Sequence, residues 1–159
     1  MGFVCQGRYA LAPIEPTDAE KYVNLQLDCM EQTYDPIYFD ALGESFTARH
    51  RAERNEYLED FHRHLASPTV RGFFAYEVPG WTPDGGLSCA VGTKIDWEKP
   101  VGMALSLCEP SSWELERADD LPELPAGTRK LTHLYTLDHT HGTGLGQALY
   151  DSVIYPDES

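Results

Sequence analysis

The sequence has few basic residues: 12 Lys and Arg stand against 26 Asp and Glu, which gives a formal net charge of −14. A surface of that sign repels phosphate backbones and anionic lipid, so we expect neither nucleic acid nor a membrane as a partner. The same charge attracts cations and favours a cationic substrate, although acidity that only keeps a protein soluble explains it equally well.

Long apolar runs and paired cysteines are also missing. No stretch approaches the ~20 apolar residues of a membrane-spanning helix, and residues 1–9 lack the apolar core of a signal peptide. The cysteines at 5, 29, 89 and 108 form no CxxC pair, so neither a zinc knuckle nor a thioredoxin-like motif is expected. We therefore expect reduced, buried thiols and a cytoplasmic location.

Ordinary globular composition fills the remaining sequence. The chain has 159 residues, 42% of them hydrophobic, which fits one domain covering residues 1–159. Apolar and aromatic runs predict strands at 9–14, 71–78, 101–107 and 129–137, while helical spacing predicts helices from 19, from about 48 and over 144–155. The fold class expected from this order is mixed α/β, with helices joined to a mixed sheet.

Local signals refine the helices. Thr17 and Glu20 have the spacing of a capping box at the start of the first helix, and the polar stretch 34–36, with Pro36, predicts its interruption. We expect three groups of apolar side chains to face the core: Ala19, Tyr22, Val23, Leu27 and Met30; then Tyr57, Leu58, Phe61 and Leu65; then Leu145, Ala148, Leu149 and Val153.

Residues 131–150 (LTHLYTLDHTHGTGLGQALY) contain the most informative pattern in the chain. A predicted strand leads directly into a loop with Gly142, Gly144 and Gly146, and a helix begins inside this loop. Glycines allow several backbone N–H groups to point at one place, and a helix N-terminus adds a partial positive charge. Such a loop binds phosphate without basic side chains. The alternative is that the glycines only allow close helix packing.

Two common phosphate motifs do not fit this loop. A mononucleotide P-loop requires Gly-Lys followed by Ser or Thr, whereas Gly146 is followed by Gln147. A dinucleotide fingerprint has the spacing GxGxxG, whereas this loop reads GxGxG late in the chain.

The stretch resembles the acetyl-CoA loop of the GNAT superfamily of N-acetyltransferases. That loop has Gln or Arg, two residues, Gly, one residue, then Gly or Ala, and it lies between the fourth strand and the third helix of the family fold. Here the pattern falls on residues 141–146, with His141 in place of the usual Gln or Arg. The His weakens one side-chain contact and leaves the backbone cradle intact. Residues 17–20 and 31–34 resemble the family's first helices more loosely.

This resemblance implies a GNAT-like acyl-CoA N-acyltransferase fold with acetyl-CoA as co-substrate and no metal. It implies direct attack of a primary amine, on a small molecule or a peptide, at the thioester. Carried over by position, the pantetheine arm would meet Thr136 and Leu137. The pyrophosphate would lie on the loop residues, which are His141, Gly142, Thr143, Gly144, Leu145, Gly146 and Gln147.

Several histidines are candidates for chemistry. An ammonium group must lose a proton before it attacks, so a base is useful, and we select His133 because it projects from the strand that leads into the loop. The alternative is a histidine packed on a sheet face. The pairs His139/His141 and His62/His64 lack a third ligand at matching spacing, so we predict no metal site, and a solvated face for the second pair.

The end of the sequence differs from the family pattern. Family members continue with further strands and a helix that carries a tyrosine acid, whereas this sequence stops at Ser159, so we expect a C-terminally shortened fold. The surface left by the shortening predicts self-association, with a homodimer as the simplest form. The acidic segment 109–128 is expected beside the acceptor entrance. The alternatives to an enzyme are a catalytically impaired CoA-binding remnant and a protein-interaction domain.

Overall fold

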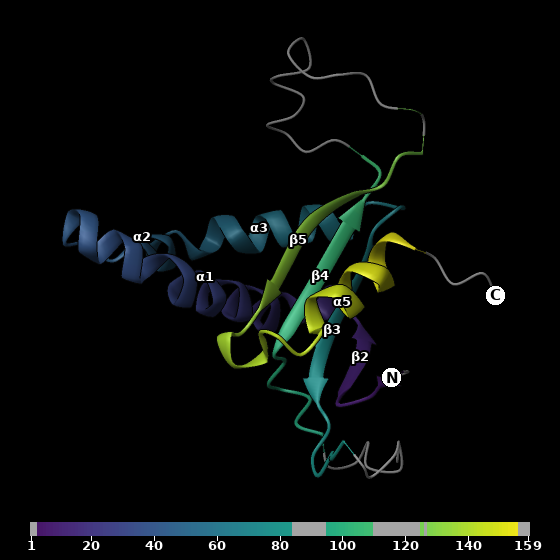
Figure 1. Ribbon diagram of the computed structural model, residues 1–159. Helices are drawn as coiled ribbons and strands as arrows, with labels where there is room; N and C mark the ends of the chain where they lie inside the picture. The colour runs from purple at the N-terminus through teal and green to yellow at the C-terminus, as the bar shows by residue number, and fades with distance from the viewer. Residues whose placement is uncertain (1–2, 84–94, 110–124, 126, 156–159) are drawn as a thin grey trace.

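The computed structural model describes residues 3–83, 95–109, 125 and 127–155, and its centre is one antiparallel sheet. The five strands follow one another in chain order across the sheet (Figure 1). Their bounds are β1 Val4–Gln6, β2 Tyr9–Pro13, β3 Arg71–Glu77, β4 Gly102–Leu107 and β5 Lys130–Thr136. Among the described residues no strand pairs with the outer edge of β5, so its backbone is accessible from that side.

Helices cover both faces of the sheet (Figure 1). One face packs against α1 (Ala19–Leu42) and α3 (Arg54–Leu65), with α2 (Phe46–Ala52) beside the outer part of α1. The other face packs against α5 (Leu145–Ile154). The predicted mixed α/β class and the four predicted strands are confirmed. The short β1, which pairs with β2, was not predicted.

Two apolar cores result, one on each face. Under α1 and α3 lie the aromatic and aliphatic side chains of Tyr22, Phe61, Phe74, Met103 and Leu105. Under α5 lie smaller residues, and the helix contributes Leu145, Leu149 and Val153. The predicted inward side of the first helix is confirmed, because all five of its residues are buried. In α5 the expected inward position of Ala148 is only half-buried.

A glycine sets how closely α5 approaches the sheet. A Cβ atom built on Gly102 would lie 3.0 Å from a methyl carbon of Leu149 and 3.1 Å from one of Leu145. It would also lie 3.3 Å from the Thr136 methyl group. Real Cβ atoms seldom approach other atoms so closely, so α5 and the end of β5 meet at a place where a side chain has no room.

The start of α1 differs from the predicted capping box. Its N-cap is Asp18, not Thr17, and a 3-10 turn, Pro16–Asp18, precedes the helix. The Asp18 carboxylate accepts a hydrogen bond from the Glu15 backbone N–H at 2.8 Å. The prediction failed because Glu15, Pro16 and Asp18 form their own turn before the helix can begin at Thr17.

The predicted interruption at 34–36 is wrong, since α1 runs through Pro36 without a break. Contacts with α2 hold the outer part of the helix. The Asp35 carboxylate accepts from the Thr47 backbone N–H and the Ser45 hydroxyl, each at 2.8 Å, and Tyr34 packs on Phe46. These tertiary contacts offset the loss of one helical hydrogen bond at Pro36.

The second predicted helix is two helices. α2 ends at Ala52 and α3 begins at Arg54, so the expected single helix from about 48 is divided at Glu53. Of its predicted inward side chains Phe61 is buried, and Leu58 and Leu65 are partly buried against the core.

Two other expectations concern cysteines and membranes. Cys29 is buried, as predicted, whereas Cys5 and Cys108 are only half-buried, and Cys89 lies outside the described residues. None of the described helices has the length and apolar character that a membrane crossing requires. Most of the acidic segment 109–128 also lies outside the described residues.

Candidate functional site

The glycine loop joins the end of β5 to the start of α5. After Thr136 the chain makes a 3-10 turn, Asp138–Thr140, and then a turn through residues 141–144. Gly142 and Gly144 have φ angles of 81° and 87°, in the left-handed region that side chains disfavour. These two positions therefore require glycine for the backbone to turn from β5 into α5.

The N-terminus of α5 is open. Gly144 is its N-cap and provides no side chain to bond the first N–H groups of the helix. A Cβ atom at Gly142, Gly144 or Gly146 would meet nothing within 4 Å. Space is therefore open around these glycines, next to the uncapped N–H groups at the positive end of a helix dipole, an arrangement that fits a phosphate group.

Hydrogen bonds from side-chain hydroxyl groups hold the loop in its conformation. The Thr140 hydroxyl donates to the Leu137 carbonyl at 2.7 Å, and the Thr143 hydroxyl donates to the Thr140 carbonyl at 2.5 Å. The Tyr9 hydroxyl lies 3.0 Å from that of Thr143 and ties the loop to β2. A loop held in this way keeps its shape before a ligand arrives, which reduces the ordering cost of binding.

The residues expected to meet the pantetheine lie at the end of β5. The N–H of Leu137 donates to the Val101 carbonyl at 2.9 Å, and its carbonyl accepts from Thr140, so its backbone is already bonded within the chain. The Thr136 carbonyl accepts from Nε2 of His141 at 3.3 Å. His141, which replaces the family's Gln or Arg, thus folds back onto β5.

The remaining predicted loop residues differ in exposure. Leu145 is buried in the core under α5, and Gln147 is exposed, with its amide donating to Asp151 at 2.8 Å. Thr143 is half-buried by its bond to Tyr9. Of the seven predicted residues, His141, Gly142, Gly144 and Gln147 are exposed, and Gly146 is half-buried.

His133 lies on the opposite face of β5, under α1 and α3. Its Nδ1 is 2.6 Å from the Tyr22 hydroxyl oxygen, and its ring packs 5.5 Å from the ring of His64. Burial and, to a smaller extent, the positive charge that His64 can carry together lower the pKa of His133 to about 4. The imidazole is therefore neutral at pH 7.

The expectation of a solvated His62/His64 face is half right. His62 is exposed, but the His64 ring turns inward toward His133, and its Nδ1 is buried without a hydrogen-bond partner. Burial lowers the pKa of His64 as well. Residues two positions apart in a helix do not lie on the same side of it, so His62 and His64 cannot both face solvent from α3, and the prediction overlooked this.

The two histidines of the other pair contact different groups, since His139 lies against Glu77 and His141 against the Thr136 carbonyl. Nε2 of His139 lies 2.5 Å from a Glu77 carboxylate oxygen. The part of the chain that the structure describes has no group of three or more His, Cys, Asp or Glu side chains placed to hold a metal ion.

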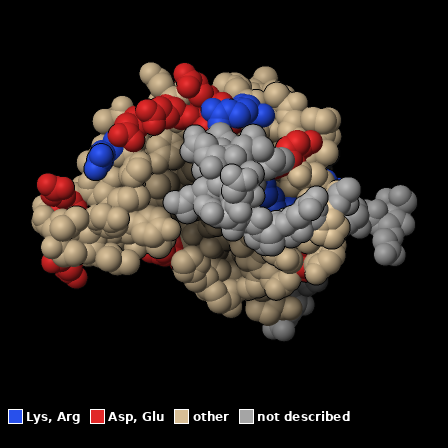
Figure 2. All heavy atoms as spheres, turned by 90° about the horizontal axis from the view of Figure 1, so that it is seen from above, with Lys and Arg blue, Asp and Glu red and all other residues tan. Residues whose placement is uncertain are grey.

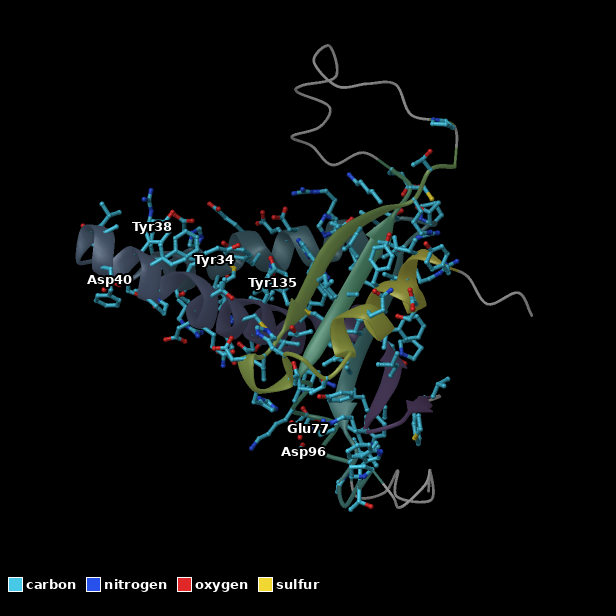
Figure 3. All side chains as sticks on the ribbon, in the orientation of Figure 1. Tyr34, Tyr38, Asp40, Glu77, Asp96 and Tyr135 are labelled. Carbon is cyan, nitrogen blue, oxygen red and sulfur yellow. The ribbon has the colours of Figure 1, made fainter. Side chains whose placement is uncertain are left out.

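A pocket of about 660 Å³ lies beside the loop. Leu137 and His139 border it, and Glu77 and Asp96 lie together at the same end of the sheet (Figure 3). Its other border contains Arg8, whose guanidinium packs 5.0 Å from the centre of the Trp81 ring. The loop thus adjoins a hollow with charges of both signs.

Sequence reasoning found the loop because its glycines are adjacent in the chain. It missed Tyr22, His64 and Tyr9, which reach the site from helices and strands far away in sequence. Single-sequence spacing has no signal for a contact such as Tyr22 with His133.

Comparisons with known proteins give structural neighbours only. No protein-family model and no curated protein matches the sequence. An aminoglycoside N-acetyltransferase, AAC(6')-Iy in complex with CoA, is 13% identical with a TM-score of 0.49, covering 94% of this chain and 70% of that one.

Two further neighbours are bacterial. A ribosomal-protein-alanine N-acetyltransferase from Brucella melitensis is 14% identical with a TM-score of 0.41, covering 90% of this chain and 66% of that one. A protein from Desulfovibrio desulfuricans described as a GNAT-family acetyltransferase is 18% identical with a TM-score of 0.44, covering 91% and 62%.

Proposed function

We propose that this protein is an N-acetyltransferase that transfers the acetyl group of acetyl-CoA to a primary amine. The observation that carries the proposal is the glycine loop, where space is open around two left-handed glycines, next to the uncapped N–H groups at the start of α5. The resemblance of residues 131–150 to the acetyl-CoA loop supports the same assignment.

The chain's own groups have separate roles in this proposal. The pyrophosphate lies on the N–H groups at the start of α5, residues 144–147, because the Thr143 N–H already donates to the Thr140 carbonyl. The pantetheine follows the open outer edge of β5 past Thr136. The amine nitrogen attacks the thioester carbonyl carbon, the C–S bond breaks, and the CoA thiolate leaves. The nitrogen gives up one proton, which a base or water must accept.

The acceptor is proposed to be a small-molecule or peptide amine that is cationic before it reacts. The net charge of −14 concentrates cations near the surface, and this effect decreases with salt. Figure 2 shows that acidic side chains outnumber basic ones on the face seen from above.

His133 stays our candidate for the base, with a changed expectation. Since its pKa is about 4, the low-pH limb of kcat/KM due to this group falls near pH 4, below the ordinary range of histidine. Replacing His133 with Ala should lower kcat/KM by roughly 100-fold. An unchanged kcat/KM in a folded His133→Ala protein would leave the histidine a packing residue.

Gly144→Asp tests the function. The substitution puts a carboxylate and a strained backbone into the phosphate site, so CoA binding measured by calorimetry should be lost. Gly127→Asp is the matched control, because Gly127 also has a left-handed φ, 81°, and open space around it, at the other end of β5. Equal CoA affinity in both variants contradicts the assignment. Gln at position 141 should keep or tighten binding.

A catalytically impaired CoA-binding protein is the second candidate, favoured by the bonded backbone of Leu137. Acetyl-CoA at 100 times its Kd should stabilise either protein by about 2.7 kcal/mol, visible as a higher Tm. A higher Tm with no turnover over a panel of amines supports the impaired protein. No change in Tm removes both candidates.

Self-association through the outer edge of β5 at Leu131, away from the Thr136 end proposed for the pantetheine, remains part of the proposal. Leu131 and Leu134 on this strand are each 37% exposed, and exposed strand edges are usually covered. Light scattering should therefore give a mass above that of one chain, and a monodisperse monomer contradicts it.

A further inference from the structure

A second, smaller pocket lies at the far end of α1, where α2 begins. Its volume is about 270 Å³, and Tyr38, Phe46 and His50 line it together with the carboxylates of Glu44 and Glu53. The turn that leads from β5 into the glycine loop contacts α1 at Gln32, ten residues before Leu42, where the Asp138 N–H donates to the Gln32 side-chain oxygen at 2.7 Å. The pocket is therefore separate from the proposed acetyl-CoA site, and its occupant does not depend on that proposal.

Aromatic rings form one side of this pocket. The ring centroid of Phe46 is 4.2 Å from that of His50 and 4.7 Å from that of Tyr38. Nδ1 of His50 lies 2.5 Å from the Tyr57 hydroxyl oxygen, which fixes the imidazole ring. Tyr34 and Tyr38 extend from the same side of α1, away from Asp40 (Figure 3). The rings thus present π faces that are held in place.

The charge around the pocket is mainly negative. Glu44 is exposed, and the Glu53 side chain is 42% exposed. The Asp35 carboxylate does not line the pocket, but it accepts a hydrogen bond at 2.8 Å from the hydroxyl of Ser45, which does. Burial raises the pKa of Asp35, but hydrogen bonds from Thr47, Ser45 and the Phe46 backbone lower it below its ordinary value, so the carboxylate is ionised at pH 7.

Arg49 is the only Lys or Arg among the residues that line the pocket. Arg49 is 84% exposed, and its guanidinium is 4.0 Å from Glu53, a distance that allows only a weak, screened attraction. Figure 2 shows acidic side chains at the end of the molecule formed by α1 and α2. Two carboxylates, Glu44 and Glu53, against one arginine leave the residues that line the pocket net negative.

We propose that this pocket binds a compact organic cation, an alkylammonium or quaternary ammonium group. Aromatic faces attract such cations through their quadrupoles within about 6 Å, and nearby carboxylates add a direct attraction. The volume is below the ~300–1,000 Å³ of sites for drug-sized ligands, so it suits a single ammonium head. A neutral ligand of the same shape would gain only the apolar contact.

Choline and its uncharged isostere 3,3-dimethylbutan-1-ol test the proposal. Each is titrated into the full chain at constant ionic strength, and binding is followed by NMR shifts of residues in α1 and α2. Choline should bind at least about five-fold more tightly than the alcohol, because only the cation interacts with the rings and carboxylates. Equal binding of the two, or no shift with either, overturns the proposal.

Variants locate the effect. Phe46→Leu keeps an apolar side chain but removes a π face, and Glu53→Gln removes a charge, so each should weaken choline binding by about five-fold. The control Glu59→Gln removes the same charge from an exposed position on α3 that does not line the pocket. If Glu53→Gln and Glu59→Gln weaken choline binding equally, only the net charge of the protein attracts choline. That result would overturn the proposed site.

Discussion

The two faces of the sheet use different kinds of buried residues. Under α5, Leu145, Leu149 and Val153 pack on small residues such as Ala75 and Ala104. The polar residue Ser106 is fully buried there and donates its hydroxyl hydrogen to the Val153 carbonyl at 2.7 Å. The Arg129 guanidinium donates to the Ser106 hydroxyl oxygen at 2.9 Å.

Under α1 and α3, titratable side chains are buried among the apolar ones. His133 meets Tyr22 and His64, and the Gln26 amide donates weakly to the Tyr135 hydroxyl at 3.4 Å. Burial raises the pKa of Tyr22 and lowers that of both histidines. We therefore expect the side chains under α5 to contribute the same free energy of unfolding at each pH, whereas the contribution of those under α1 and α3 should depend on pH.

The largest expected effect is on the α5 face. Leu149→Ala removes a fully buried side chain from a small core, so it should lower the free energy of unfolding by about 2–5 kcal/mol. Urea unfolding at pH 5 and pH 7 measures this loss, and the two values should agree. A loss of unfolding free energy that differs between pH 5 and pH 7 would contradict the expected pH independence of the α5 face.

The next effect is on the histidine face. The folded pKa of His133 is about 4 and the unfolded value about 6.5, so the unfolded chain binds more protons between these values. The free energy of unfolding is therefore highest above pH 6.5, where His133 is neutral in both states. It falls by up to about 3 kcal/mol as the pH decreases toward 4. His64 acts in the same direction.

The measurement compares unfolding of the wild type with that of His133→Leu from pH 4 to pH 7. The difference between the two proteins should change over this range because leucine has no proton to bind. A constant difference would show that His133 titrates normally in the folded protein and would remove the contrast between the faces.

The smallest effect concerns the hydroxyl of Tyr22. Tyr22→Phe keeps the ring packing against Phe61 and removes only the bond to His133, so the free energy of unfolding should fall by about 1 kcal/mol. Nitrogen chemical shifts of His133 should change with the variant, because Tyr22 determines which ring nitrogen carries hydrogen. Unchanged shifts would mean that the two groups are not bonded in solution.

The sequence predicted those parts of the fold that depend on local patterns. Alternating and apolar runs located β2, β3, β4 and β5, and the glycines located the turn into α5. Pro36 misled because the bonds of Asp35 to Ser45 and Thr47, which hold that end of α1, come from residues ten or more positions away. The candidate base was identified, but its low pKa depends on burial by α1 and α3, which a single sequence does not show.

The missing side chain at Gly102 links the sheet to the loop. Because Leu145 and Leu149 of α5 lie within about 3 Å of the position of a Cβ atom on residue 102, a methyl group on this residue must push them outward by some tenths of an ångström. Leu145 is the first residue of α5, directly after Gly144, so such a displacement reaches the loop itself. Residue 102 therefore influences the position of the loop, and Gly102→Ala should change the CoA affinity proposed for it, from more than forty residues away in the sequence.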